Sequence, residues 1–534
     1  MGTATVDTPN GTNSTRRGFL KSVALTASTL ALGCAESSRS AAGRKRPNII
    51  FLLTDDQRDN SLGIMGHPWV QTPNLDVLIK NGVRFSNAYI AEPTCSPSRT
   101  SLFTGMHERV HGVGFSSSYK LNEEQWARTY PALLREHGYY TGFIGKFGVE
   151  YYTFRGRAEK KFDYWRGHDG WARFFPKTAK NCREYWDSRH DIITPVMGES
   201  VTRFLEIAPK GRPFCLSVSF SIPHGSQTSS MHPWTEPANR NPRLKDHPVY
   251  GDLYRDLDIS IPEDTATDAY RFIPKEIMDQ DRGRKRTYSY TYTLEQCHEL
   301  HLRYYQLITG LDKVVGELMA ALKEEGLHEE TVIVFASDHG LLMGEYGMGG
   351  KGLLYDLTAK YPCFIYDPRL PKRQRGRTID NLVSSLDVTS TILDYAGVKQ
   401  PEEMEGMSLK PLLTNRPVRW RDELFLENLY TGRDTPFSEG IRRGKWKYIR
   451  MYDGVTPYKE GHTDFRGRQP DFEQLFDLSV DPDEKDNLIA DSDPEVIDEL
   501  NSLRIRCQEL SDALNRRRQE YKETHEVTAR PMPG

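Results

Sequence analysis

The chain has 534 residues and a formal net charge of −3. A single hydrophobic core stops growing well before this length, so we expect two domains, or one large domain with an appendage. Hydrophobic residues at 37% and charged residues at 27% are typical of a soluble globular protein. The small net charge excludes a general attraction to nucleic acid or to membranes, so any selectivity for charged partners must be local.

The N-terminal segment, residues 1–42, differs from the rest of the chain. A polar stretch leads into T-R-R-G-F-L-K at Thr15–Lys21, and an apolar run follows as far as Cys34. This order of segments is that of a twin-arginine export signal, which predicts a periplasmic or extracellular protein; a tail with a chance arginine pair is the alternative. The L-A-L-G-C sequence at Cys34 resembles a lipoprotein cleavage box, but Ala31 stands where leucine is usual, so a lipid anchor is the lesser option. No segment reaches the ~20 apolar residues of a spanning helix.

Strands and helices alternate after this segment, which predicts an α/β sheet. Arg46–Asp56 is an apolar, β-branched run that stops at two carboxylates, as expected of a buried parallel strand that ends in a site. A helix is predicted over Thr72–Gly82, with Asn74 as its cap and Gly82 as its stop. Further predictions are strands at Tyr139–Ile144, Phe214–Phe220 and Thr331–Gly340, and a helix with apolar residues from Leu307 to Leu322 that closes at Gly326.

The region between about residues 150 and 300 shows little periodicity and is longer than ordinary connections, which is typical of insertions that shape a binding site. Within Tyr151–Lys180, eight Lys/Arg stand against three Asp/Glu, interleaved with rings such as Trp165 and Trp171. Cations beside flat rings suit a sulfated sugar chain, because the charges attract sulfates and the rings stack on pyranose faces. An ordinary packed surface loop explains the pattern equally well.

The chain changes character again after about residue 410. We therefore predict a catalytic domain over residues 46–410 and a smaller α+β domain with an antiparallel sheet over residues 411–534. The predicted elements of the smaller domain are strands at Glu423–Tyr430 and Lys445–Tyr452 and a charged helix from Pro494 toward Tyr521.

The seven cysteines are too few for a dense disulfide framework in a chain of this length. Apart from Cys34 and Cys95, an odd number remains at unrelated spacings. At most two bridges are possible, and no particular bridge is predicted.

Acidic residues follow two of the predicted strands. Asp55 and Asp56 end the first, and Asp338 with His339 ends another. Ligands gather at the carboxyl ends of strands in open α/β sheets. Three converging carboxylates would repel one another without a cation, whereas oxygen-rich clusters suit calcium or magnesium. Helix caps or turn aspartates would explain either pair alone, but both together less well.

Residues 93–105 read P-T-C-S-P-S-R-T-S-L-F-T-G. They resemble the signature of the type I sulfatases, in which the cysteine of C-x-P-S-R is oxidised to formylglycine. The stretch G-Y-Y-T-G-F-I-G-K-F-G at Gly138–Gly148 resembles the second signature of that family, and L-F-D-L-S-V-D-P-D-E-K-D-N-L is typical of its C-terminal domain. The resemblance covers residues 46 to about 490. It implies an alkaline-phosphatase-like fold, in which helices flank a large, mostly parallel or mixed sheet.

The resemblance also implies a chemistry for Cys95. The hydrated aldehyde would carry two hydroxyls on one carbon; one attacks sulfur and the other later expels sulfate, so water need not attack sulfur. One calcium ion would polarise the sulfate. Its implied ligands are Asp55, Asp56, the modified Cys95, Asp338 and His339.

Further roles carry over by match to the family. Arg99 would hold the aldehyde hydrate, while Lys146 and Lys351 would neutralise sulfate oxygens in the transition state. His224, in S-I-P-H-G, would protonate the departing alcohol. A lone histidine is usually structural, so this role rests mainly on the resemblance.

One departure concerns Gly148. The family commonly has a histidine there, two residues after the lysine that Lys146 matches, and that histidine helps to release sulfate. Either another base, such as His111, reaches the site, or elimination is slow and sulfated residue 95 accumulates.

The sequence thus predicts an exported, calcium-dependent sulfate ester hydrolase for a sulfated carbohydrate, matured by a formylglycine-generating enzyme and without a nucleic-acid partner. One alternative is a phosphonate or phosphate monoester hydrolase of the same superfold, because the anions share their shape. The other is a sulfated-glycan binding protein with an unmodified Cys95.

Overall fold

The computed structural model divides into Met1–Arg46 and Pro47–Gly534, and the fold below is that of the second unit. Residues 3–42 of the predicted export signal, including Cys34, lie outside the described residues. None of the described helices is long and apolar enough to cross a membrane. The described residues are 1–2, 46–115, 117, 119–149, 158–170, 175–224, 252–279, 291, 293–431, 435–455, 458–525 and 528–529.

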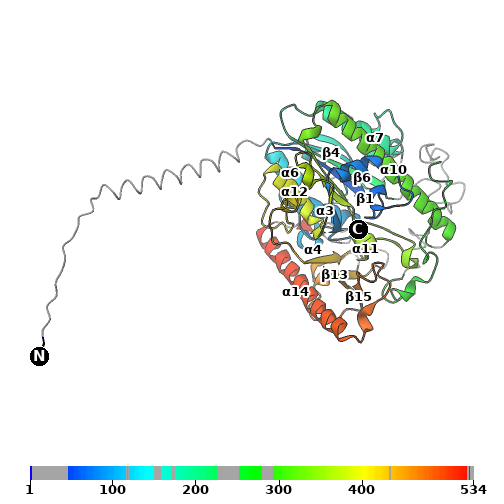
Figure 1. Cartoon of the computed structure of the whole chain (residues 1–534), viewed down its shortest axis with the longest axis vertical. Helices are drawn as coiled ribbons and strands as arrows, with labels where there is room; N and C mark the ends of the chain where they lie inside the picture. The colour runs from blue at the N-terminus through cyan, green and yellow to red at the C-terminus, as the bar shows by residue number, and fades with distance from the viewer. Residues whose placement is uncertain are drawn as a thin grey trace. The chain divides into compact units, whose positions relative to one another are not determined.

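A mixed sheet of eight described strands forms the centre of this unit (Figure 1). The strand order is β11-β2-β10-β7-β1-β6-β4-β5, and all neighbours run parallel except β10, which is antiparallel to β2 and β7. The predicted α/β class with a mostly parallel sheet is therefore confirmed. The strands are β1 (Asn48–Asp55), β2 (Val83–Tyr89), β4 (Tyr140–Lys146), β5 (Tyr164–His168), β6 (Phe214–Pro223), β7 (Thr331–Ser337), β10 (Cys363–Tyr366) and β11 (Arg377–Ser384).

Helices cover both faces of the sheet, which is why β1 is buried along its whole length. Its alternate residues enter two separate cores: Ile50 and Leu52 pack with α2, α7 and α10, whereas Ile49 and Phe51 pack with α3, α6 and α12. The helices are α2 (Pro73–Lys80), α3 (Cys95–Thr104), α4 (Glu108–His111), α5 (Glu123–Ala127), α6 (Tyr130–Glu136), α7 (Ile193–Ile207), α10 (Leu294–Glu324), α11 (Asp356–Ala359), α12 (Leu386–Ala396) and α13 (Lys410–Leu413).

A second, antiparallel sheet lies in the C-terminal part of the chain, as predicted. Its strands are consecutive in order, and α14 (Pro494–Thr524) packs on them through a core that includes Ile441, Tyr448 and Leu503 (Figure 1). The domain boundary near residue 410 stays a prediction. The strands are β12 (Glu423–Asn428), β13 (Phe437–Arg443), β14 (Trp446–Tyr452) and β15 (Phe472–Asp477). Two further two-stranded sheets pair β3 (Tyr119–Lys120) with β16 (Thr528–Ala529) and β8 (Leu342–Met343) with β9 (Gly349–Gly350).

Helix ends differ from the predictions. Thr72, not Asn74, precedes the first residue of α2, because Pro73 suits the first helical position; the Asn74 amide instead donates to Asp312 at 2.8 Å. Helix α10 begins at Leu294, well before the predicted apolar stripe, since the Thr293 side chain caps it. The predicted stop at Gly326 fits, with a positive φ of 67° just beyond the helix.

The region between residues 150 and 300 contains regular structure that was missed, namely β5 and α7. Of the rings and cations predicted to bind sugar there, the described residues Trp165 and Arg166 do not form an open platform. Trp165 stacks on Phe143 with ring centroids 5.2 Å apart, and the Arg166 guanidinium binds Asp187 at 2.7 Å. Because β5 lies beside β4, its side chains pack against the core; Trp171 lies outside the described residues.

The six described cysteines are buried and form no disulfide.

Candidate active site

Five adjacent parallel strands, β7, β1, β6, β4 and β5, end at one edge of the sheet. Polar side chains stand at each of these carboxyl ends, where open α/β sheets bind ligands. They are Asp338 and His339 after β7, Asp55 and Asp56 at β1, His224 after β6, Lys146 on β4 and His168 on β5.

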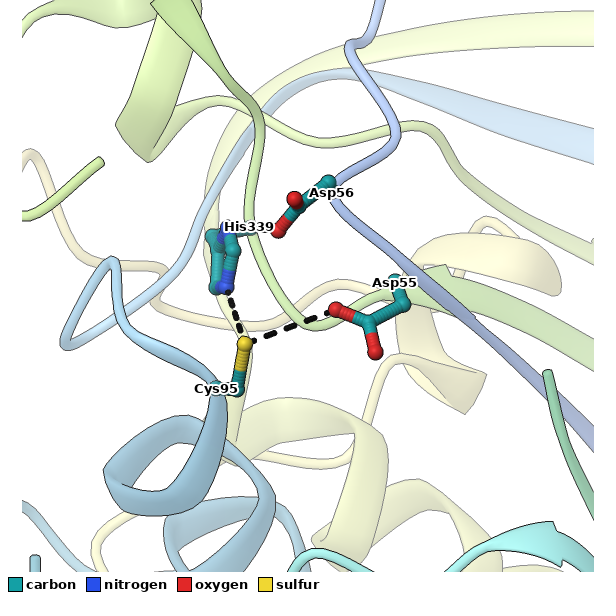
Figure 2. Close-up of side chains that lie close together, drawn as sticks. All are labelled: Asp55, Asp56, Cys95 and His339. Atoms are coloured by element: carbon teal, nitrogen blue, oxygen red, sulfur yellow. Dashed lines mark hydrogen bonds and ion pairs between the residues drawn. The ribbon is translucent and has the colours of Figure 1, made fainter. Parts of the chain in front are cut away.

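Cys95 is the first residue of α3 and is almost fully buried, with 4% of its surface exposed. Its Sγ lies 3.4 Å from Asp55 Oδ1 and 3.2 Å from His339 Nε2 (Figure 2). The Lys351 ammonium lies 2.9 Å from the same sulfur. The start of a helix favours negative charge, so this position favours an anionic ligand beside residue 95.

Asp55, Asp56, Cys95 and His339 offer ligand atoms that all lie within 4.8 Å of one another (Figure 2). Burial alone would raise the pKa of Asp55, but Lys146 and Arg99 outweigh it and hold that pKa well below the ordinary value. The pKa of Asp56 is also lowered, because Lys351 and His224 outweigh its burial. Two ionised carboxylates in a buried group suit a hard divalent cation, so these four of the five predicted ligands could hold a metal ion.

Asp338 stands beside this group and braces it. Its Oδ2 accepts from Arg99 Nε at 2.8 Å, and its Oδ1 accepts from the backbone N–H of Asp56 at 3.1 Å. Asp56 has a φ of 64°, an unusual value for a residue other than glycine. Tyr304 fixes this turn, because its hydroxyl donates to the Asp56 carbonyl and accepts from the Arg58 N–H, both at 2.8 Å. Tyr304 was not predicted, because no sequence feature distinguishes it from the other buried residues of α10.

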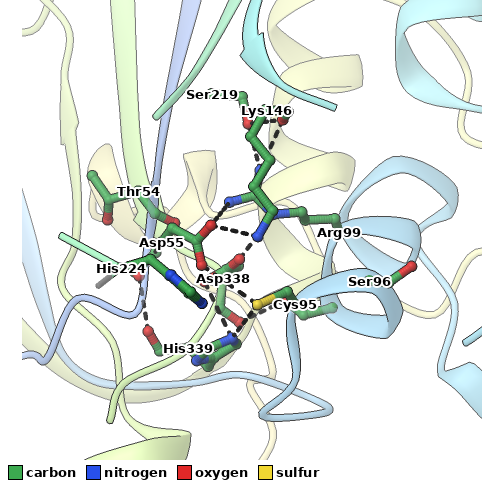
Figure 3. A network of polar contacts seen from close by, with 12 residues as sticks. Thr54, Asp55, Cys95, Ser96, Arg99, Lys146, Ser219, His224, Asp338 and His339 are labelled. Atoms are coloured by element: carbon green, nitrogen blue, oxygen red, sulfur yellow. Dashed lines mark hydrogen bonds and ion pairs between the residues drawn. The ribbon is translucent and has the colours of Figure 1, made fainter. Parts of the chain in front are cut away.

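Arg99 is completely buried and contacts Asp55 of β1, Lys146 of β4 and Ser219 of β6 (Figure 3). Its Nη1 donates to Ser219 Oγ at 2.5 Å and to the Lys146 carbonyl at 3.1 Å. The Lys146 ammonium lies 2.5 Å from Asp55 Oδ2. Burial lowers the pKa of Lys146, but Asp55, Cys95 and Asp338 together outweigh it and raise the pKa above the ordinary value. Ser219 was also missed; it lies inside a predicted strand, where a serine carries no distinguishing signal.

His224 and Lys351 approach the carboxylate of Asp56 from two directions. His224 Nε2 lies 3.7 Å from Oδ2, and Lys351 Nζ lies 2.6 Å from Oδ1. The His224 side chain remains 23% exposed, in keeping with a group that meets substrate. Burial lowers the pKa of His224, although Asp56 opposes the shift.

His111 is not brought to this cluster. Its Nε2 lies 3.0 Å from Ser101 Oγ, and its Nδ1 accepts from the Val113 N–H at 3.0 Å. Both ring nitrogens therefore serve the connection between α3 and α4, which corrects the proposal that His111 replaces the family histidine.

The structure explains why position 148 is a glycine. It has a φ of 62°, and a Cβ there would lie 2.6 Å from Arg99 Cδ. The stem of Arg99 thus fills the space that a side chain at position 148 would need.

Comparison with known proteins agrees with this geometry. Residues 47–398 match the family model described as Sulfatase, and residues 344–512 match the model for the C-terminal part of N-sulphoglucosamine sulphohydrolase. The chain is 30% identical over 501 residues to an arylsulfatase of Clostridium perfringens, a match that covers 86% of this chain and 94% of that protein. It is 26% identical over 501 residues to an N-acetylglucosamine-6-O-sulfatase of Bacteroides thetaiotaomicron, covering 84% and 83% of the two chains.

A solved structure gives the same fold. It is that of a protein in complex with its substrate, D-glucosamine-2-N,6-O-disulfate, and it matches with a TM-score of 0.64 at 25% identity, covering 88% of this chain and 98% of that one. The chain belongs to the sulfatase family, with its alkaline-phosphatase-like fold, and is a sulfuric ester hydrolase.

Proposed function

We propose that this sulfatase is exported and desulfates a carbohydrate, with Cys95 converted to formylglycine and one calcium ion held beside it. The observation that carries the proposal is the position of Cys95: it is the first residue of α3 and lies within 3.4 Å of Asp55, His339 and Lys351. Export is supported by the twin-arginine pattern at Thr15–Lys21.

The burial of Cys95 bears on when conversion occurs. With 4% of its surface exposed, the thiol is out of reach of another enzyme in the folded protein. A formylglycine-generating enzyme would therefore act on the C-S-P-S-R stretch before folding is complete and would supply the oxidant that turns the thiol carbon into an aldehyde.

The surrounding side chains have distinct tasks in this proposal. Asp55, Asp56, residue 95, Asp338 and His339 would hold the calcium ion, which would polarise a bound sulfate when present. One hydroxyl of the hydrated residue 95 attacks sulfur, and the S–O bond to the alcohol breaks. Lys146 and Lys351 neutralise the charge that spreads over the sulfate oxygens.

His224 gives the departing alcohol its proton. Burial lowers the pKa of its free ring, so the ring needs help to become an acid. A sulfate that binds between Lys351 and His224 brings negative charge beside the imidazole, and this charge raises its pKa.

The carbohydrate substrate class is supported by the relatives, which include an N-acetylglucosamine-6-O-sulfatase and the protein bound to D-glucosamine-2-N,6-O-disulfate. Sulfated glucosamines are therefore the first substrates to test.

Mass analysis of the peptide that contains residue 95 tests the proposal. Protein co-produced with a maturation enzyme should show loss of the thiol and gain of an aldehyde, and should release nitrophenol from 4-nitrophenyl sulfate faster than from 4-nitrophenyl phosphate. Faster phosphate release would favour the phosphonate or phosphate ester alternative. An intact thiol in a protein that binds sulfated sugar without turnover would favour the binding-protein alternative.

A further inference from the structure

His168 occupies the last position of β5, at the same sheet edge as the proposed nucleophile. In the parallel β4–β5 pair it is the register partner of Lys146, so both side chains leave the same face of the sheet. The Lys146 ammonium reaches Asp55 at 2.5 Å, and Asp55 in turn reaches Cys95 at 3.4 Å. His168 therefore lies beside Lys146 in the sheet, at the same edge as the side chains that surround residue 95.

The imidazole of His168 is buried but not satisfied. Only 2% of the residue is exposed, and neither ring nitrogen has a hydrogen-bond partner of normal geometry; the Asp169 backbone is close enough to the ring to raise its pKa but does not meet that geometry. Buried polar groups almost always have a partner, so an unpaired ring indicates that a water molecule or a ligand group belongs beside it.

The charged groups around the ring keep it neutral. Burial lowers the pKa of His168, and Lys146 and Arg99 lower it further, to about 3; the Asp169 backbone and Asp55 oppose them weakly. Tyr185 from the neighbouring turn packs edge-on, with ring centroids 6.1 Å apart. A neutral ring of this kind accepts a proton only when negative charge arrives nearby.

Such a proton acceptor is needed in the second half of the reaction. After transfer, residue 95 carries a sulfate ester and a hydroxyl on one carbon, and that hydroxyl must lose its proton. The other histidines near residue 95 are engaged: His339 contacts Cys95 at 3.2 Å, and His224 contacts Asp56 at 3.7 Å on the side of the departing alcohol. His111 is held by Ser101.

We propose that His168 is the base of the elimination step and receives the proton through one buried water beside Lys146; this inference rests on the proposed function. The water takes the proton of the residue 95 hydroxyl and passes one of its own to the imidazole. The electron pair of the broken O–H bond forms the second bond of the aldehyde, the carbon–oxygen bond to sulfate breaks, and sulfate leaves with the electron pair of that carbon–oxygen bond.

Bound sulfate makes the His168 ring a stronger base. Once it is bound, its oxygens neutralise Lys146 and Arg99, the two cations that keep the free ring from taking a proton. His168 thus becomes basic only while a sulfate is present, which restricts proton uptake to the second half of the cycle.

Rapid-quench kinetics with 4-nitrophenyl sulfate tests this role. Wild-type matured enzyme should show no burst, whereas His168→Gln should release one nitrophenol per enzyme at the wild-type rate and then turn over ~10² to 10⁴-fold more slowly. The residue 95 peptide of the variant should carry sulfate by mass. His301→Gln is the matched control, because His301 is equally buried but bonds the Cys297 carbonyl of its own helix at 2.9 Å.

A second measurement needs neither turnover nor a variant. In wild-type protein labelled with ¹⁵N-histidine, inorganic sulfate should move the His168 ring signals toward the protonated form. An unshifted ring, or a His168→Gln variant slowed only in nitrophenol release with no sulfated peptide, would overturn the proposal. If wild-type protein shifts but lacks an aldehyde and turns over no sulfate ester, the proposed function fails while the response of His168 to sulfate stands.

Discussion

Two buried groups of acidic residues in this protein have opposite electrostatics. The first surrounds Cys95. The second, here named the Glu92 cluster, consists of Glu92, Glu108 and Glu427 with His107 and Arg109, and lies where α4 meets the antiparallel sheet. In the first group, cations outweigh burial and lower the pKa of Asp55 and Asp56; in the second, burial raises the pKa of Glu92 to about 8 and that of Glu108 well above its ordinary value.

The difference shows what separates a reactive site from a structural one. Around Cys95 the ionised acids form a group that could hold a metal ion, and two lysines and Arg99 lie beside it. In the Glu92 cluster, Glu92 and Glu108 accept hydrogen bonds from uncharged donors: the Glu108 N–H donates to Glu92 at 2.5 Å, and Tyr458 donates to Glu108 at 2.7 Å. Clustered carboxylates alone therefore do not identify a metal site; the charges that face them do.

The largest expected effect is at the nucleophile. Cys95→Ala should reduce turnover by on the order of 10⁶-fold, because it removes the atom that attacks sulfur, while the melting temperature changes little. Cys215→Ala is the matched control, since this buried β6 thiol lies in the apolar core and its pKa is raised by burial to about 12. Steady-state kinetics that found Cys95→Ala as active as Cys215→Ala would remove residue 95 from the mechanism.

Removal of the metal should have the next largest effect. Exhaustive chelation should lower kcat by ~10² to 10³-fold, which corresponds to the several kcal/mol that a bound cation contributes, and calcium should restore activity. Adding calcium should not alter the Glu92 cluster, whose acids are held by protons and neighbouring side chains. Activity that survives chelation, with no calcium found by elemental analysis, would contradict the metal assignment.

The sequence could predict those site residues that lie in a recognisable motif or at the end of a predicted strand. Asp55, Cys95 and Asp338 sit in recognisable patterns at strand ends or in the C-x-P-S-R motif, and the structure brings their side chains together. Tyr304 and Ser219 could not be found this way, because their roles depend on which helix or strand packs beside them.

His168 was missed for a related reason. Strand β5 lies in a region whose helical and strand periodicity was overlooked, although the spacing of Val196, Met197, Val201 and Phe204 in α7 was there to be read. His111, by contrast, looked available in the sequence, but its fold neighbours occupy both ring nitrogens. Single histidines therefore need tertiary contacts before a role can be assigned.

A smaller effect is expected at Gly148, because the side chain of Arg99 packs closely against it. Gly148→Ala should cost about 1–3 kcal/mol of stability and lower kcat about tenfold, because the new Cβ would lie 2.6 Å from Arg99 Cδ and would push the guanidinium away from Asp338. Gly211→Ala is the control for backbone strain alone: it has a φ of 86° but no atom within 4 Å of the added Cβ. Equal changes in melting temperature and kcat for both variants would mean that the contact with Arg99 is unimportant.

The smallest effect on turnover is expected at the Glu92 cluster, where the change appears only in the pH dependence of stability. The pKa of Glu92 is raised from an ordinary value of 4.5 to about 8, chiefly by burial, so the folded state binds its proton more tightly than the unfolded chain does. This contribution is fully present below pH 4.5 and is lost as the pH rises toward 8. Glu92→Gln keeps the group neutral at every pH, so denaturant unfolding should find the variant and wild type similar near pH 5 and the variant more stable by on the order of 4 kcal/mol near pH 8.5. The exposed Glu206→Gln should follow wild type at both pH values.

A stability difference between Glu92→Gln and wild type that stays constant from pH 5 to 8.5 would show that Glu92 is ionised in the folded protein, and the contrast between the two acidic groups would then not hold.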